Sequence, residues 1–146
     1  MKQYYLAHQL KYRHGIRSIE LELEKKYGIN LINPFYDTER NDIKRIDSGE
    51  IVNLDLTVKD KKDIVAFDLD TIKNCDGVIC FIIDHDVIGS FMEIFYAWRE
   101  LNIPVYIVCP NDKIRLHPWV VTCSFKLFKY LEELEDYIKE NMENMK

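Results

Sequence analysis

Glu93 is the residue of this chain whose position best suits it to covalent chemistry. It follows a short, apolar, β-branched run, Gly77 to Ile83, which predicts a buried strand. The segment from Ser90 predicts a helix, because apolar side chains recur there at helical spacing. We therefore expect Glu93 in the first turn of a helix, just beyond the carboxyl end of a strand, where open α/β sheets bind ligands. The helix N-terminus would favour the ionised carboxylate that a nucleophile requires.

Glu93 also has a purely structural interpretation. Ser90 to Glu93 fits the S-x-x-E capping box, in which the serine and glutamate side chains bind unpaired amides at a helix start. The motif alone favours this cap. The setting favours function, because Gly89 precedes the serine at a strand-to-helix corner and the acidic segment Asp84-His85-Asp86 lies just before it.

Asp68 is a second carboxylate in an unusual place. The stretch from about Lys61 to Asn74 predicts a helix with one face made of Ile64, Phe67, Asp68, Thr71, Ile72 and Cys75. A carboxylate within an otherwise apolar face is costly unless it is paired or used. A cap or a salt bridge explains Asp68 as well as a functional role does.

The run Phe67 to Ile72, FDLDTI, resembles the D-x-D-x-T signature of haloacid dehalogenase phosphatases. A phosphatase using Asp68 and Asp70 would depend on Mg²⁺ and release phosphate. In that superfamily the signature usually lies near the N-terminus, whereas here it lies mid-chain. The helical periodicity also favours a helix over the strand that this signature needs.

Composition narrows the class of protein. At 146 residues the chain is expected to form one domain, residues 1–146, with a core that needs no cross-links. A net charge of −5 without a basic block argues against nucleic-acid binding. No leader-like segment precedes the first strand and no apolar run could span a bilayer, so we expect a cytoplasmic protein. Four cysteines without C-x-x-C spacing predict reduced structural thiols: Cys75, Cys80, Cys109 and Cys123.

Strands and helices alternate along the chain, which predicts parallel pairing with right-handed crossovers. The predicted strands cover residues 3–7, 30–33, 77–83, 104–109 and 124–128. The predicted helices cover residues 16–27 and 61–74, a segment from residue 90, and residues 131–142. Polar loops are expected from 34 to 59 and around IRLHPW, residues 114–119.

Five motifs spread over the chain form a further pattern. They are Tyr5-Leu6-Ala7, Pro34, Asp68-Leu69 with Ile72 and Asp76, Gly89 to Ala97, and Ile103-Pro104-Val105. Together they resemble the nucleoside 2-deoxyribosyltransferase family and its relatives, the nucleotide N-glycoside hydrolases. The resemblance covers most of the chain, with Phe95 in place of a glycine that the family pattern has after the glutamate.

The resemblance implies a flavodoxin-like fold, a three-layer sandwich of about five parallel strands with helices on both faces. It implies a homo-oligomer whose active sites borrow residues from a neighbouring subunit. The expected reaction is cleavage of the N-glycosidic bond of a 2′-deoxynucleoside, with transfer of the sugar to another nucleobase. Hydrolysis of a (deoxy)nucleoside 5′-monophosphate and a non-catalytic nucleotide-binding module are the alternatives. No cofactor or metal is implied.

Three residues match the catalytic residues of that family. Glu93 matches the nucleophile, which would form a covalent glycosyl intermediate as retaining glycosidases do. Asp68 matches the acid that serves the departing base, a role that desolvation would support by raising its pKa. Tyr5 matches the tyrosine that orients the nucleophile.

The resemblance also suggests substrate-binding residues: Asp86, Gly89, Ser90, Met92, Gln9 and Phe35. Asp86 lies one residue from the position that reads the 5′ end of the sugar, where an acidic residue suits a free hydroxyl. Gln9 would bind a base edge and Phe35 would stack on the base. Arg115 and His117 of a neighbouring subunit would instead hold a phosphate. Each has an ordinary core or surface role as its alternative.

Two charged residues of the long polar loop, Arg40 and Asp42, are interpreted as solvated charges.

Overall fold

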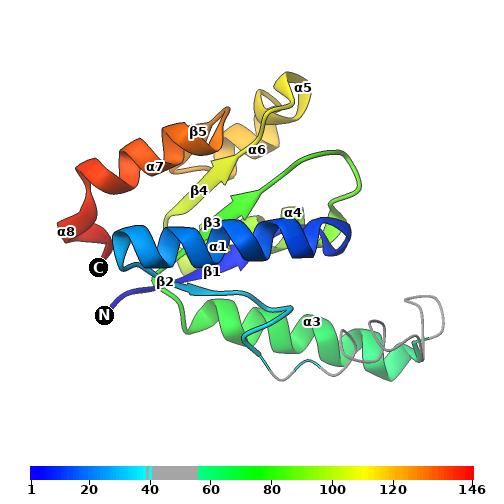
Figure 1. Ribbon diagram of the computed structural model, residues 1–146. Coiled ribbons are helices and arrows are strands. Elements are labelled where there is room, and N and C mark those ends of the chain that lie inside the picture. Colours follow the sequence, from blue (N-terminus) through cyan, green and yellow to red (C-terminus); the bar gives the residue numbers. More distant parts are fainter. Residues whose placement is uncertain (39, 41–55) are drawn as a thin grey trace.

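The computed structural model describes residues 1–38, 40 and 56–146. These residues form an all-parallel five-stranded sheet in the order β2-β1-β3-β4-β5 (Figure 1). The strands are β1 (Gln3–Ala7), β2 (Asn30–Ile32), β3 (Gly77–Phe81), β4 (Val105–Val108) and β5 (Lys126–Phe128). The predicted flavodoxin-like fold is confirmed. This order reverses between β1 and β3, and such a reversal opens a crevice at the carboxyl ends of the two strands.

Helices cover both faces of the sheet (Figure 1). One layer holds α1 (Arg13–Tyr27), which follows the short turn η1 (Leu10–Tyr12), and α7 (Leu131–Glu140) with α8 (Met142–Met145). The other holds α3 (Val58–Lys73), α4 (Ile88–Tyr96), which continues into the π-helical turn η3 (Ala97–Leu101), and α5 (Asp112–Arg115) with α6 (Pro118–Cys123). The sheet therefore separates two hydrophobic cores.

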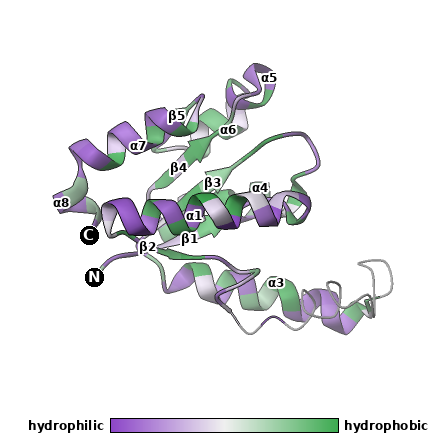
Figure 2. Ribbon diagram, in the orientation of Figure 1, coloured by the Kyte–Doolittle hydropathy of each residue, from purple (hydrophilic) through white to green (hydrophobic). Residues whose placement is uncertain are grey.

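Strand residues alternate between the two cores. Tyr4 and Leu6 of β1 pack in the core under α1 and α7, whereas Tyr5 and Ala7 face α3 and α4. The central strand β3 is hydrophobic along its length, and the helices around the sheet carry long hydrophilic stretches (Figure 2). This alternation points the Tyr5 side chain towards the layer that carries Asp68 and Glu93.

The segment expected as a loop around residues 114–119 is instead two short helices. The Asn111 side chain accepts a hydrogen bond from the Ile114 amide at the start of α5. The His117 ring accepts one from the Trp119 amide at the start of α6, where Pro118 takes the first helical position. Such short helices contain too few residues to show a helical period, so only their capping residues could have predicted them.

The predicted apolar face of α3 is partly wrong. Ile72 and Cys75 are buried as expected, but Phe67 is 38% exposed. The phosphatase interpretation fails here too, because Phe67 to Ile72 lies inside this helix and not on a strand.

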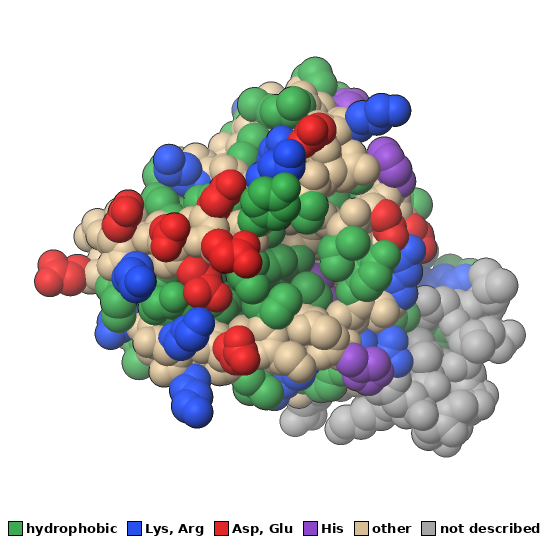
Figure 3. Space-filling model, turned by 45° about the horizontal axis from the view of Figure 1, so that its top comes forward, with side chains coloured by type: hydrophobic (Ala, Val, Ile, Leu, Met, Phe, Trp, Pro, Cys, Tyr) green, Lys and Arg blue, Asp and Glu red, His purple; other side chains and the backbone are tan. Residues whose placement is uncertain are grey.

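The cysteines agree with the expectation from composition. All four cysteines are buried free thiols, which confirms their structural interpretation. Acidic and basic side chains are interspersed on the face shown in Figure 3, without a continuous basic surface. None of the described helices is long and apolar enough to cross a membrane.

Candidate active site

A cavity of about 710 Å³ opens at the carboxyl end of β1 and β3, at the reversal of strand order. Its walls come from the segment after β1, from α3 and from the start of α4. Its size is in the range of small-molecule sites. Many of the predicted site residues line it: Gln9, Phe35, Asp68, Asp86, Gly89, Ser90 and Glu93. We refer to it as the polar cavity.

Helix α4 begins earlier than the sequence predicted, which changes the position of Glu93. The helix starts at Ile88 after Val87, without a side-chain cap and without an acidic residue in its first turn. Ser90 therefore lies inside the helix, and the predicted capping box is absent. Glu93 falls in the second turn, where its Oε2 atom is buried without a hydrogen-bond partner among the described residues. The carboxylate is thus not used as a cap.

The protonation state of Glu93 is opposite to the one expected from a helix N-terminus. Burial raises its pKa to about 8, and the charge of Asp68 acts in the same direction. The Tyr5 hydroxyl and Arg40 oppose this rise without cancelling it. Since Glu93 lies beyond the first turn, the helix dipole does little to favour its charge. The protonated form of Glu93 therefore predominates at neutral pH.

Tyr5 of β1 is fully buried beside Glu93. Burial raises the pKa of its hydroxyl well above the usual value, and the Glu93 charge adds to the rise. Neither the Tyr5 hydroxyl nor Glu93 Oε2 makes a well-formed hydrogen bond within the described part of the chain. The two groups therefore interact electrostatically, and the hydroxyl remains able to donate to either the carboxylate or a substrate.

Asp68 lines the same cavity and is paired with Arg40. Nη1 of Arg40 lies 3.2 Å from Oδ2 of Asp68, and the two side chains are only 9% and 16% exposed. The guanidinium carbon of Arg40 also lies 5.0 Å from the centre of the Phe35 ring. The interpretation of Arg40 as a solvated charge is wrong, whereas Asp42 lies outside the described residues. The salt bridge expected as one explanation of Asp68 exists, and it sits in the cavity beside Glu93.

The Gln9 side chain holds the loop before α4 and has no capacity left for a base edge. Its Nε2 atom donates to Oδ1 of Asp84 at 2.7 Å and to the Asp86 carbonyl at 2.6 Å. Its Oε1 atom accepts from the amides of Ile83 at 3.2 Å and Asp84 at 3.4 Å. Both donors and both acceptor sites of the amide are filled. The predicted contact with a base is therefore replaced by a role in positioning this loop.

Asp84 completes the anchoring of the loop, a role that sequence reasoning missed. The Tyr12 hydroxyl and the Lys11 ammonium each lie 2.6 Å from its Oδ2 atom. These bonds hold the pKa of Asp84 well below its usual range. Asp86, the predicted reader of the 5′ end, has an 82% exposed side chain 4.0 Å from Lys11. Its role in reading the 5′ end stays a prediction.

Phe35 is fixed on the cavity wall by neighbours that the sequence did not reveal. Its amide donates to Oδ1 of Asn33, which also contacts Nε2 of His8 at 3.0 Å. The rings of His8 and Phe35 meet edge to face, with centres 4.8 Å apart. Burial lowers the pKa of His8, which favours the neutral ring.

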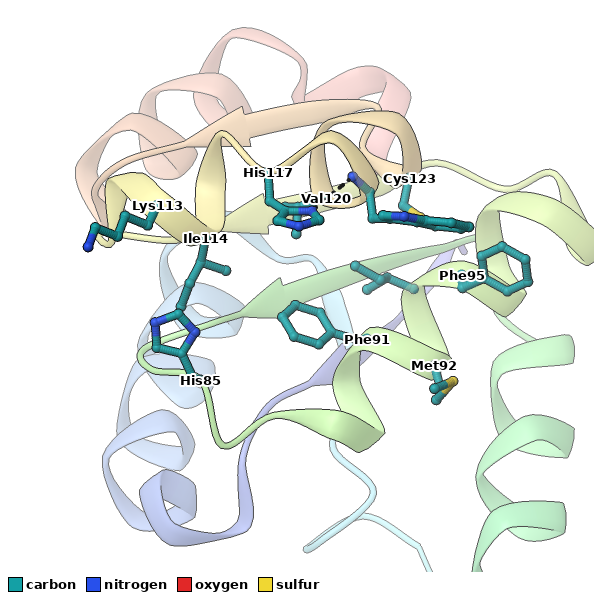
Figure 4. Close-up of a pocket in the computed structure, with 11 residues that line it drawn as sticks. His85, Phe91, Met92, Phe95, Lys113, Ile114, His117, Val120 and Cys123 are labelled. Carbon is teal, nitrogen blue, oxygen red and sulfur yellow. Dashed lines mark hydrogen bonds between the residues drawn. The ribbon is translucent and has the colours of Figure 1, made fainter.

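A second cavity, of about 570 Å³, lies on the other side of α4 (Figure 4). Phe91, Met92 and Phe95 of α4 face Trp119 of α6 across it, and we call it the apolar cavity. Met92, a predicted substrate-binding residue, lies here and not in the polar cavity. His117 lines it as well (Figure 4).

Arg115, the other predicted phosphate ligand, donates to the Cys109 carbonyl at 2.9 Å and to Asp112 at 2.6 Å. Neither Arg115 nor His117 lines the polar cavity of their own chain. Their predicted role in a neighbouring subunit stays a prediction.

Among the described residues, no three His, Cys, Asp or Glu side chains lie together so that they could hold a metal ion. The polar cavity brings together two neighbouring carboxyl groups, one buried and one paired with an arginine.

Comparison with known proteins supports the fold. No protein-family model and no curated protein matches the sequence. Among solved structures, the 2-deoxyribosyltransferase from the psychrotolerant bacterium Bacillus psychrosaccharolyticus is similar, with a TM-score of 0.67 and 18% identity over 96% of this chain and 95% of that one. The 2-deoxyribosyltransferase from Leishmania mexicana has a TM-score of 0.62 and 14% identity over 96% of this chain and 98% of its own. Over nearly its whole length, this chain has the fold of the 2-deoxyribosyltransferases.

Proposed function

We propose that this chain cleaves the N-glycosidic bond of 2′-deoxynucleosides or their phosphates and transfers the sugar to another nucleobase. The observation that carries the proposal is the Glu93 carboxyl group, whose Oε2 atom is buried and unbonded beside Asp68 in the polar cavity. The fold shared with the 2-deoxyribosyltransferases supports the same reaction class.

The first step is attack by a Glu93 oxygen on the anomeric carbon. A bond forms between that oxygen and the carbon, the bond from the carbon to the base nitrogen breaks, and its electron pair leaves with the base. Because Oε2 of Glu93 has no hydrogen bond to lose, it reaches the sugar without breaking an existing contact. Tyr5, buried beside the carboxyl group, would orient it for attack.

Protonation of the leaving base explains why two carboxyl groups share the cavity. Before the reaction the proton resides on Glu93, whose pKa is raised to about 8 by burial and by the charge of Asp68. Attack requires ionised Glu93, and departure of the base requires a proton. One proton, moved from Glu93 to Asp68 and then to the base nitrogen, meets both requirements. The reactive form is thus the carboxyl pair that carries a single proton.

The second half of the reaction releases the sugar from Glu93. A second base attacks the anomeric carbon from the position that the first base left, and its lost proton returns to the carboxyl pair. Water attacking at the same position would instead give a hydrolase. We further propose that a neighbouring copy of the chain helps to close this site, as the resemblance implies.

The test is an incubation of the purified protein with deoxynucleosides and their monophosphates, each with and without a second free base. New nucleoside formed only with the acceptor base would support transfer, and free base without it would indicate hydrolysis. Mass spectrometry of the rapidly quenched protein should show a deoxyribosyl adduct on the peptide that contains Glu93. An absence of reaction across the panel, under conditions where the protein binds these compounds, would overturn the proposal in favour of a binding module.

A further inference from the structure

A buried carboxyl group that the proposed reaction does not use lies two hydrogen bonds from the wall of the polar cavity. Glu20 of α1 is only 1% exposed, and its pKa is raised to about 7, chiefly because it is buried. A carboxyl group is costly to bury, and a hydrophobic side chain of similar size could fill the same space at a lower cost. The reason for its presence therefore lies in the hydrogen bonds that it makes.

Both carboxyl oxygens of Glu20 accept hydrogen bonds. Oε1 accepts from Nη1 of Arg17 at 2.8 Å, and Oε2 accepts from Nδ2 of Asn33 at 2.8 Å. Asn33 directly follows β2 and is fully buried. The same Arg17 nitrogen lies 2.9 Å from Oδ1 of Asp37, whose Oδ2 accepts from the backbone N–H of Asn33 at 2.9 Å. Glu20 and Asp37, joined by Arg17, thus hold Asn33 by its side chain and by its backbone.

Asn33 connects Glu20 to two residues that line the polar cavity. Its Oδ1 atom accepts from the backbone N–H of Phe35 at 3.1 Å and contacts Nε2 of His8 at 3.0 Å. A backbone N–H can only donate, so the Asn33 atom that faces Phe35 is the oxygen, and the amino group faces Glu20. The pattern of donors and acceptors therefore allows one orientation of the Asn33 side chain. That orientation holds the backbone of Phe35 at the cavity wall.

The Phe35 ring is packed by a second member of the same network. The His8 ring meets it edge to face, with ring centres 4.8 Å apart, and His8 itself contacts Asn33. The Phe35 side chain is partly exposed and lines the cavity, so part of the ring is available to a ligand. An aromatic ring in such a place can stack on a nucleobase. Asn33 thus contacts both the backbone of Phe35 and the ring that packs against it.

We propose that Glu20 and Asn33 are positioning residues that fix Phe35 where it stacks on the nucleobase of the substrate. This inference rests on the proposed function, because the stacking partner is the base of a nucleoside. Neither Glu20 nor Asn33 lines the polar cavity, so both act through Phe35. A buried hydrogen-bond network favours a single arrangement of its members, and a ring held in this way needs no ordering when the base binds.

The binding test removes the polarity of the network and then restores it in reverse. Glu20→Gln places an amino group against one of two donors, Asn33 or Arg17, and should weaken binding roughly 10-fold, about as much as Phe35→Ala does. Adding Asn33→Asp to Glu20→Gln puts a carboxylate opposite the glutamine amino group, and its other oxygen still accepts from Phe35. This double variant should bind within about threefold of the parent. Binding is measured by calorimetry in the Glu93→Gln background, so that the ligand is not consumed, with whichever deoxynucleoside or monophosphate of the turnover test binds most tightly.

Dependence on the Phe35 ring separates positioning from a general loss of stability. In the Phe35→Ala background, Glu20→Gln should weaken binding less than about twofold, because the ring through which it acts is gone. Glu24→Gln is the matched control, since Oε1 of Glu24 accepts from the Leu31 amide at 3.1 Å and Glu24 lies one turn further along α1, outside the cavity. It should leave binding unchanged. An equal loss with and without the Phe35 ring, or no recovery when Asn33→Asp is added, would overturn the proposal.

Kinetics with the intact nucleophile separate this inference from the proposed function. Stacking on the base is present before and during the reaction, so Glu20→Gln should raise KM roughly 10-fold with little change in kcat. If the loss of binding depends on Phe35 but no substrate is turned over, the positioning role stands and the proposed reaction falls. If substrate is turned over and Glu20→Gln keeps the wild-type KM, the positioning role is wrong and the reaction stands. If none of these compounds binds, both are overturned.

Discussion

Helix α4 separates two cavities that differ in chemistry although they are built from the same stretch of chain. Gly89, Ser90 and Glu93 line the polar cavity, whereas Met92 and Phe95 line the apolar one. The polar cavity holds the buried carboxyl group of Glu93, whose Oε2 atom has no hydrogen-bond partner among the described residues. The apolar cavity is walled mainly by hydrophobic side chains and rings (Figure 4). A buried titratable group with a shifted pKa marks a reactive site, whereas an apolar, ring-lined surface marks a contact. Under the proposed function, we therefore expect the reaction on the polar side of α4 and contact with another molecule on the apolar side.

The largest expected effect separates two adjacent residues of α4. Glu93→Gln should lower turnover by roughly a thousandfold or more, because an amide cannot form the glycosyl ester. The variant should stay folded, since the glutamine resembles the protonated glutamate that predominates at neutral pH. Met92→Ala, on the apolar side, is the matched control and should stay within a few-fold of wild type. Turnover is measured as base release by chromatography, and folding is measured by thermal unfolding. Retained turnover in Glu93→Gln would remove Glu93 as the nucleophile.

The next effect concerns the acid of the polar cavity. Asp68→Asn should lower turnover roughly a hundredfold, because proton transfer by a positioned side chain contributes about that much. The loss should be smaller for bases that leave readily, since these need less help from a proton. Asp70→Asn, two residues along α3 and exposed, serves as the control. A loss that is the same for every base would show that Asp68 acts only through its salt bridge with Arg40.

The sequence predicted the sheet and the long helices well because each of these elements has its own pattern of apolar residues. The β-branched runs of β3 and β4 and the helical spacing in α1, α3 and α7 are local signals, and the structure confirms them. The start of α4 was predicted two residues late, because Ser90 and Glu93 match a capping box while Val87, the actual cap, offers no side-chain signal. Helices α5 and α6 were missed because they are too short to show a period.

The site was predicted in outline but not in its electrostatics. The sequence singled out Glu93, Asp68 and Tyr5, and the structure brings all three together. It could not show that Arg40, 28 residues before Asp68, pairs with that carboxylate. Nor could it show that the amide of Gln9 is filled by a loop more than 70 residues away. Both depend on contacts between distant segments, which no local pattern encodes.

A smaller effect is expected from the hydroxyl of Tyr5 and should appear in the pH profile. If the reactive carboxyl pair carries one proton, kcat/KM should fall as the pH rises through the raised pKa of Glu93, about 8. Tyr5 lowers that pKa, so Tyr5→Phe should move this alkaline limb to higher pH and reduce turnover roughly tenfold through lost orientation. Tyr4→Phe changes the neighbouring residue of β1, which packs in the opposite core, and should leave the limb in place. If the alkaline fall in kcat/KM of Tyr5→Phe occurs at the same pH as in the wild type or at lower pH, the proposal that the reactive carboxyl pair carries one proton is contradicted.

The smallest effect on turnover is expected from a substitution on the apolar side of α4. The same substitution should weaken the association of the chain with copies of itself. Trp119 is 64% exposed with its ring centre 6.1 Å from that of Phe95, and Met92 beside them is 65% exposed. Such exposed apolar groups are typical of contact surfaces, and a homo-oligomer is predicted from the resemblance. Trp119→Ser should therefore weaken self-association roughly tenfold or more. At protein concentrations where the variant is still associated, its turnover per subunit should change by less than about threefold.

Sedimentation and turnover, measured over the same dilution series, show whether turnover in the polar cavity depends on self-association through the apolar side of α4. Val58→Ser, an equally exposed apolar position at the start of α3, controls for a general loss of surface hydrophobicity. If turnover falls in step with dissociation, each polar cavity needs a neighbouring copy, and residues such as His117 become candidates for completing it. If the dissociated subunit keeps full turnover, the prediction of borrowed active-site residues is wrong. The polar cavity would then be complete within one chain, and the apolar cavity would serve contact alone.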